Sequence, residues 1–239
     1  MKAIIDIHTH TYASGHAYST LQENVYAAAE RGLKIMAVTD HAPKMPGGAH
    51  IYYFWNLRVL PEYINNVRIL RGVEANILNI KGKIDIPELL ADELDICLAS
   101  FHPPCYKPSS GLKQTKALIN TLQNKNVKII GHPGDERFPF EIEPVIDAAR
   151  SLQKCLEINN ASLAPYGFRP GGKKFILRIL EVCAAKKCPV VLGSDAHYSS
   201  KVGDFQYAED LLEEMKFPAD LVLNYNSEKF YSYFGIKKV

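Results

Sequence analysis

The sequence contains no apolar run that approaches the roughly 18 to 20 residues a membrane-spanning helix needs. Its N-terminal stretch, MKAIIDIH, is too short in apolar residues for a secretory signal peptide. No CxxC pair occurs among the five cysteines, and an odd number cannot all be paired within one chain. We therefore expect reduced thiols, no membrane partner and a cytoplasmic protein.

A strong charge of one sign is also missing. The net charge is only +2, and the lysines and arginines are scattered in short pairs such as Lys173 and Lys174. Such pairs are typical of solvated helix faces, so we expect no nucleic-acid partner. No linker or low-complexity tract interrupts the 239 residues, and 47% of them are hydrophobic. The composition favours a single domain over residues 1–239.

Short apolar runs alternate with longer segments of helical period along the whole chain. Strands are expected at residues 3–7, 35–39, 68–75, 94–100, 128–131, 155–158, 190–193 and 221–223. Helices are expected at residues 20–31, 112–123, 142–151, 173–186 and 204–215, with a weaker pattern over 57–63 and 86–91. This alternation predicts repeated βαβ units and a parallel sheet, either open and doubly wound or closed as a barrel.

The longest segment predicted to be irregular runs from residue 41 to residue 56. It contains two prolines and two glycines before the aromatic run IYYFW. Long loops inside compact domains are often functional, so this segment is a candidate lid over a site.

Histidines are concentrated where predicted strands end. The five long helical segments contain none, whereas six of the eight histidines directly follow a strand. In a parallel barrel the carboxyl ends of all strands open onto one face, where active sites are built. Crowding imidazoles and carboxylates there without a cation would carry a heavy desolvation cost. The sequence therefore predicts a metal site formed by residues that share this position: His8, His10, His16, His41, Glu74, His102, His132, Asp195 and His197.

Successive motifs along the chain resemble those of the PHP family, named for polymerase and histidinol phosphatase. They are DIHTHT, TDH, GVEAN, SFH, GHPG and GSDAH, and they occur in the same order from Asp6 onward. The longer runs DHAPKMPG, NLRVLP, VRILRGVEANI and LEINN resemble the YcdX-like branch of probable phosphatases. The resemblance implies a distorted (β/α)7 barrel with a trinuclear metal centre, commonly zinc, and more weakly a homotrimer.

The resemblance also implies a division of ligands among three metals. The first would be held by His8, His10, Glu74 and Asp195. The second would be held by His16, His41 and His197, and the third by Glu74, His102 and His132, so that Glu74 bridges two sites. Histidine and carboxylate ligands also suit Mn²⁺ and Fe²⁺.

Three divalent ions with two ligand carboxylates leave a cationic centre, which attracts a dianionic phosphate. We expect hydrolysis of a small phosphomonoester by a metal-bound hydroxide held by Glu74, Asp195 and His197. Arg169 and Asn160 are the candidate substrate contacts. Where the family more often has serine this chain has Ala161, which leaves the remaining substrate contacts open.

Two further carboxylates and one thiol lie close to these motifs. Asp6 and Asp40 are expected to orient ligand imidazoles, or else to be ordinary strand-end residues. Cys105 follows FHPP with no base in an obvious position, so we interpret it as a bystander thiol and not a nucleophile.

Three other functions stay open. PHP modules of DNA polymerases are associated with nuclease activity, which makes phosphodiester cleavage one alternative. A metal-binding regulatory domain without turnover is another. A zinc amidohydrolase would also begin with HxH after its first strand, although the additional His16 and His41 favour three metals.

Overall fold

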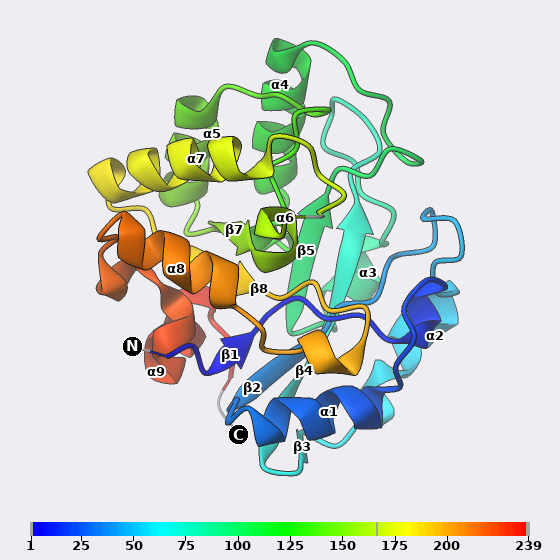
Figure 1. Ribbon diagram of the computed structural model, residues 1–239. Helices are drawn as coiled ribbons and strands as arrows, with labels where there is room; N and C mark the ends of the chain where they lie inside the picture. Colours follow the sequence, from blue (N-terminus) through cyan, green and yellow to red (C-terminus); the bar gives the residue numbers. More distant parts are fainter. Residues whose placement is uncertain (1, 166, 238–239) are drawn as a thin grey trace.

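Seven parallel strands form the centre of the molecule, as the ribbon in Figure 1 shows. This is a computed structural model, and it describes residues 2–165 and 167–237. The strands neighbour one another in chain order, β1-β2-β4-β5-β6-β7-β8, while the short β3 (Tyr63–Ile64) pairs antiparallel with β4. The seven are β1 (Ile5–Asp6), β2 (Ile35–Val38), β4 (Val67–Asn76), β5 (Ile96–Ser100), β6 (Ile129–Ile130), β7 (Cys155–Asn159) and β8 (Val190–Gly193).

The first and last of these strands meet, so the sheet is a nearly closed barrel. Thr9 and Ala196 form a parallel bridge just beyond the ends of β1 and β8. On either side of it, the Asp195 amide donates to the His8 carbonyl and the His10 amide donates to the Ala196 carbonyl, each at 2.9 Å. The prediction of a distorted (β/α)7 barrel is confirmed, and the open doubly wound sheet is excluded.

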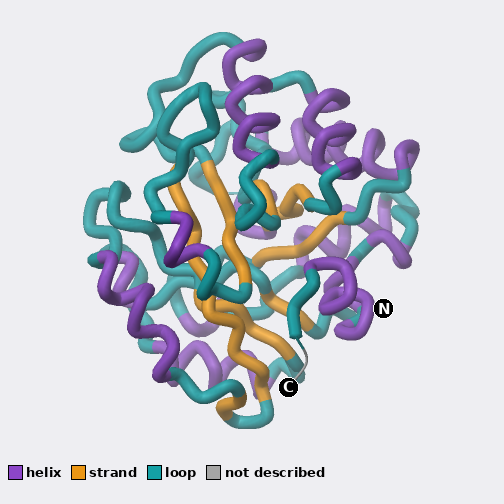
Figure 2. Tube along the Cα trace, turned by 180° about the vertical axis from the view of Figure 1, so that it is seen from behind, coloured by secondary structure: helices purple, strands orange, loops and turns teal. Residues whose placement is uncertain are grey.

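Helices surround the barrel and connect its strands (Figures 1 and 2). They are α1 (Leu21–Glu30), α2 (Ile51–Asn56), α3 (Glu88–Ala91), α4 (Gly111–Leu122), α5 (Ile142–Ser151), α6 (Asn160–Leu163), α7 (Gly172–Lys186), α8 (Gln206–Glu214) and α9 (Ser227–Phe234). All five long helices predicted from sequence are present, with ends within two residues of expectation. Helix α1 begins where Thr20 and Glu23 cap each other reciprocally, which satisfies amides that the first turn leaves free.

Two sequence predictions about this framework were wrong, and one helix was not predicted. Residues 221–223 do not form a strand: two 3-10 turns, Ala219–Leu221 and Leu223–Tyr225, lie there, and only Val222 between them makes a single parallel bridge, with Val190. The Asn224 side chain explains the difference, because it donates to the carbonyls of Ile5 and Leu192 and accepts from the Leu192 amide. The segment 41–56 is not irregular throughout, since it contains α2, and α9 was not predicted at all.

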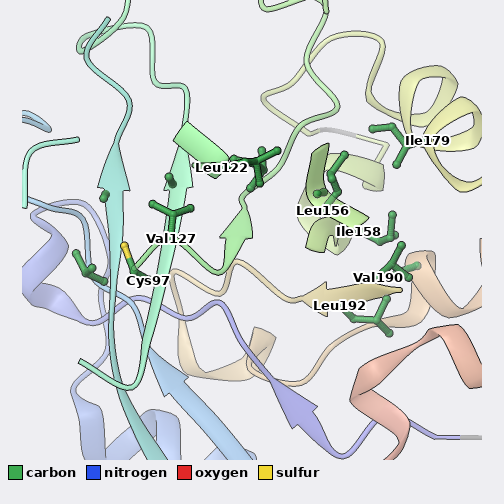
Figure 3. Packing of buried hydrophobic residues seen from close by; sticks show 14 of the residues in the cluster. Cys97, Leu122, Val127, Leu156, Ile158, Ile179, Val190 and Leu192 are labelled. Atoms are coloured by element: carbon green, nitrogen blue, oxygen red, sulfur yellow. The ribbon is translucent and has the colours of Figure 1, made fainter. Parts of the chain in front are cut away.

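Two apolar clusters stabilise the barrel. The larger lies between the strands and the outer helices, and Figure 3 shows Leu156 and Val190 of the strands packed near Ile179 of α7. The smaller fills the barrel interior, where Phe230 and Phe234 of α9 pack against strand side chains such as Ile5. Helix α9 thus covers the amino-terminal end of the barrel, opposite the carboxyl end where active sites of such barrels lie. Among the described helices none is both long and apolar enough to cross a membrane.

Candidate metal centre

All nine predicted ligand side chains meet at the carboxyl end of the barrel, with Glu74 at their centre. Strand β4 places Glu74 on the same face as Leu70, which belongs to the interior cluster, because alternate strand residues share a face. The Glu74 carboxylate contacts five imidazoles, at distances between 2.6 and 3.6 Å. These belong to His8, His10, His41, His102 and His132.

Asp195 and the remaining histidines extend the cluster toward the surface. Asp195 Oδ1 lies 3.3 Å from His10 Nε2 and 3.6 Å from His197 Nδ1. His16 Nε2 lies 3.2 Å from His41 Nε2. The His16 side chain is exposed and that of His197 is 31% exposed, whereas Glu74 is fully buried. The centre therefore opens to solvent at its His16 and His197 side.

Within the described residues, three sets of ligand atoms are each close enough to hold one metal ion. They are His8 with His10 and Glu74, His10 with His41 and His197, and His41 with Glu74 and His102. In each set the atoms lie within 4.8 Å of one another. Glu74, His10 and His41 each belong to two sets, so the geometry shares ligands more widely than the division implied by family resemblance. That division stays a prediction.

The unsatisfied atoms of the cluster fit a metal. His41 Nδ1, Glu74 Oε2 and His102 Nε2 are buried and make no well-formed hydrogen bond, although their residues form one of the three ligand sets. Buried polar atoms without partners are costly, and a cation accepting their lone pairs would remove that cost. Imidazole nitrogens and carboxylate oxygens are the donor set that zinc and related divalent ions take.

The pKa shifts of the cluster differ from residue to residue: those of Glu74 and His10 favour the forms that coordinate metals, whereas burial of His8 is outweighed by the carboxylates of Glu157, Glu74 and Asp195, which raise the pKa of His8 well above its ordinary value. Burial raises the pKa of Glu74, but the imidazoles of His102 and His8 outweigh it and hold this pKa well below its ordinary value. Burial, reinforced by His197 and His41, lowers the pKa of His10 well below its ordinary value. An ionised carboxylate and a neutral imidazole are the forms that coordinate metals.

Partners behind the cluster fix how two of the imidazoles point. Ser14 donates its hydroxyl proton to Asp40 Oδ1 at 2.7 Å, so its oxygen accepts from His10 Nδ1 at 2.9 Å. The Asn76 amide nitrogen donates to Asp85, so its carbonyl oxygen accepts from His102 Nδ1 at 2.7 Å. In both cases the proton sits on Nδ1 and Nε2 faces the centre with a free lone pair.

The two predicted orienting carboxylates therefore differ in role. Asp40 acts on His10 through Ser14, and it also accepts a 2.5 Å hydrogen bond from Tyr53 Oη of α2. Asp6 touches no imidazole: it accepts from the backbone amides of His8, Ser194 and Gly203. Asp6 thus joins the start of the barrel to its last strand. The Tyr53 contact ties α2, and with it the predicted lid segment, to the wall of the centre.

Sequence reasoning missed one buried carboxylate. Glu157 of β7 is fully buried, its Oε1 lies 2.8 Å from His8 Nδ1, and its Oε2 accepts from the His132 backbone amide at 2.6 Å. A signal was present, because a glutamate inside the otherwise apolar run of a predicted strand needs a buried partner.

The structure separates the two candidate substrate contacts. Arg169 Nη2 lies 3.0 Å from Asp195 Oδ2, and its side chain is 16% exposed, so it reaches the rim of the centre. Asn160 does not: its side chain is buried and accepts from the Ala208 amide of α8 at 3.0 Å. Its neighbour Asn159 lies at the centre, where Asn160 was expected, and donates to Asp195 Oδ2 at 3.2 Å.

Cys105 lies near the site without a nucleophile's surroundings. Burial, with the charges of Asp85 and Glu74, raises the pKa of this thiol to about 11. Its Sγ donates to the Lys44 carbonyl. A protonated thiol is a poor nucleophile, which fits the interpretation of Cys105 as a bystander.

The fold and the site together define an α/β barrel with a histidine- and carboxylate-rich metal centre at its carboxyl end. Residues 6–161 match the PHP domain model, and the chain belongs to the PHP domain family. It is 46% identical to a probable phosphatase of Caldanaerobacter subterraneus subsp. tengcongensis over 239 residues, covering 100% of this chain and 93% of the relative. A probable phosphatase of Clostridium acetobutylicum is 42% identical over 237 residues, covering 99% and 96%.

A solved structure shares the fold. The histidinol phosphate phosphatase of Lactococcus lactis subsp. lactis, complexed with zinc, L-histidinol and phosphate, superposes with a TM-score of 0.61. The match covers 91% of this chain and 95% of that chain at 17% sequence identity. It confirms the barrel architecture of this chain.

Proposed function

We propose that this protein is a metal-dependent phosphatase that hydrolyses a small phosphomonoester. The observation that carries the proposal is the convergence of seven histidines and Asp195 around Glu74. Full-length relatives named probable phosphatases support the same reaction class. Glu74 and Asp195 are the acidic members of the set, so the centre would stay cationic when it holds the three divalent ions that we propose. A phosphomonoester dianion is therefore attracted more strongly than a neutral ester or amide.

Zinc is the first ion to test. The donor set suits it, and a PHP-fold phosphatase from Lactococcus lactis has been seen with zinc and phosphate. Divalent ions bound here would lower the pKa of a coordinated water toward about 7 and polarise the phosphoryl oxygens. Three ions remain our proposal, and Mn²⁺ or Fe²⁺ are the other candidates.

The chain's own residues supply position and charge. The imidazoles oriented by Ser14 and Asn76 hold the ions without needing to move during the reaction. Arg169 is held at the rim by Asp195, Ser162 and Asn159, and its remaining N–H donors are our candidates for binding phosphate oxygens. Asn159 fixes the other side of the same carboxylate oxygen and is the amide we now propose as a site residue.

The test is phosphate release by zinc-, manganese- and iron-loaded protein across a panel of phosphomonoesters, with phosphodiesters and an amide as comparison substrates. His8→Ala removes one proposed ligand and should abolish phosphate release. Lys229→Ala changes a surface lysine and should leave phosphate release unchanged. Release from diesters alone would favour the phosphodiesterase alternative. Confirmed metal binding with no turnover on any substrate would contradict a phosphatase and favour a regulatory domain.

The cellular compartment and the oligomeric state are also proposals. All five cysteines are free thiols, which suits a reducing compartment such as the cytoplasm. We propose that the 239 residues act as one domain, and light scattering of the purified protein would decide between a monomer and the trimer implied by family resemblance.

A further inference from the structure

Glu157 is the least expected group near the metal centre. It is a fully buried carboxylate, and in the described part of the chain no lysine or arginine lies within ion-pair distance of it. Its partners are the His8 imidazole and the His132 backbone amide. Burying a charge with so few partners is costly, so a carboxylate here needs a role that a neutral side chain would not fill.

Its two oxygens serve two different ligands of the centre. Oε1 accepts from His8 Nδ1, which leaves His8 Nε2 pointing at Glu74, 3.5 Å away, and at His10, 3.0 Å away. Oε2 accepts from the amide of His132, a residue whose φ is +27°. A positive φ is strained for histidine, and it turns this ring so that Nε2 meets Glu74 at 2.7 Å.

The neighbouring strand makes room for this arrangement. A side chain at Gly193 of β8 would collide with Glu157 Oε1, and its Cβ would stand 2.7 Å from His8 Cβ. Glycine at this position lets the carboxylate lie against the backbone, directly behind His8. Two strands therefore determine where the carboxylate lies: β7 carries Glu157, and Gly193 of β8 leaves room for its side chain.

We propose that Glu157 is a positioning residue of the metal centre, fixing the Nδ1-protonated form of His8 and the turned backbone of His132 at the same time. Only a carboxylate offers two acceptor oxygens in this place. An amide offers one acceptor and one donor, so in Glu157→Gln either His8 Nδ1 or the His132 amide must face an NH2 group. The proposal rests on the metal centre proposed above, and it does not depend on phosphatase turnover.

The first measurement is zinc affinity by competition with a chromogenic chelator, using metal-free protein. We expect Glu157→Gln to weaken zinc binding about 10- to 100-fold, the range seen when groups behind a ligand are removed. Asp135→Asn is the matched control, because Asp135 is also buried and lies in the loop after β6, but pairs with Arg137 and touches no ligand. It should bind zinc as the parent protein does. Equal affinities for Glu157→Gln and the parent would overturn the proposal.

Thermal unfolding of the metal-free variants separates positioning from simple packing. A role confined to the fold would lower the unfolding temperature of metal-free Glu157→Gln and leave zinc affinity unchanged once folded. For a positioning role we expect Glu157→Gln to show only a small shift in unfolding temperature and a large loss of zinc affinity.

A second readout begins with the parent protein. In the zinc-loaded parent protein, NMR should show a slowly exchanging proton on His8 Nδ1, assigned by its absence in His8→Ala. In a folded Glu157→Ala protein that proton should exchange rapidly with solvent. A zinc-loaded parent protein in which His8 carries no Nδ1 proton would contradict the proposal, whatever the enzyme's activity.

Discussion

Ser14 Oγ lies 2.9 Å from His10 Nδ1 and at the same time donates its own proton to Asp40. The hydroxyl can donate only once, so it must accept from His10, and it accepts from the His41 amide as well. One small side chain therefore sets the protonated nitrogen of one ligand and the backbone of another. Groups of this kind commonly determine how well a metal site binds.

Replacing Ser14 by alanine should weaken metal binding without unfolding the protein. The variant leaves His10 Nδ1 without an acceptor, so the ring can rotate or carry its proton on Nε2, and we expect zinc affinity to fall about tenfold. Chelator competition measures it. Ser19→Ala is the control, because Ser19 is equally buried but its hydroxyl accepts from the Ser199 amide instead of an imidazole. Equal losses in the two variants would mean that the Ser14 contact has no special role.

Metal removal should lower thermal stability and leave the barrel folded. An ion that binds only the native state stabilises it by about 2.7 kcal/mol at a free concentration 100 times its Kd. For a chain of this length that corresponds to roughly 5 to 10 °C in unfolding temperature. Far-ultraviolet circular dichroism should hardly change, because neither apolar cluster includes a ligand. Calorimetry with and without chelator tests this, and an unfolding temperature that ignores verified metal loss would contradict it.

Asn224 should be a stability residue with no role in the chemistry. Its side chain makes three hydrogen bonds to backbone groups of β1 and β8, and all are buried. Asn224→Ala would leave those groups without partners and should cost about 3 kcal/mol in denaturant unfolding. Asn120→Ala is the control, because its one exposed hydrogen bond, to the Ile80 carbonyl, should be worth well under 1 kcal/mol. Similar losses in both variants would show that the barrel does not need this contact.

The barrel and the convergence of the candidate ligand side chains could be predicted from sequence, because both depend on local sequence patterns. Strand and helix periods are short-range, and histidines that follow strands must meet wherever parallel strands end together. The strand expected at residues 221–223 failed for the opposite reason. Its apolar run was suitable, but the Asn224 amide, bonded to β1 and β8 from far along the chain, holds the backbone in turns instead.

Which residue pairs with which candidate ligand could not be predicted, because common residue types supply these partners. Glu157 is 149 positions from His8, and nothing in the sequence links the two. Which of Asn159 and Asn160 reaches the centre depends on the residue at which the strand ends. Strand β7 ends at Asn159 and α6 begins at Asn160, so adjacent side chains point to different elements.

Cys105 should alkylate slowly despite being partly exposed. With a pKa of about 11, only about one thiol in a thousand is ionised at pH 8, and the thiolate is the reactive form. The iodoacetamide rate at this residue should rise about tenfold for each pH unit from 8 to 10. Mass spectrometry of the Cys105 peptide over time gives the rate, and Cys105→Ser should keep its phosphatase activity. A fast, pH-independent reaction would contradict the assignment as a bystander thiol.

Arg169 should act on substrate binding more than on metal binding. Arg169→Lys keeps a positive charge beside Asp195 but loses the fork that could hold two phosphate oxygens. We expect KM to rise about tenfold, and inorganic phosphate to become a similarly weaker competitive inhibitor, with zinc content unchanged. Arg178→Lys is the control, because Arg178 lies on the exposed face of α7 and pairs with Glu181. If KM and phosphate inhibition stay unchanged while zinc is lost, Arg169 serves the metal ligand Asp195 instead of the substrate.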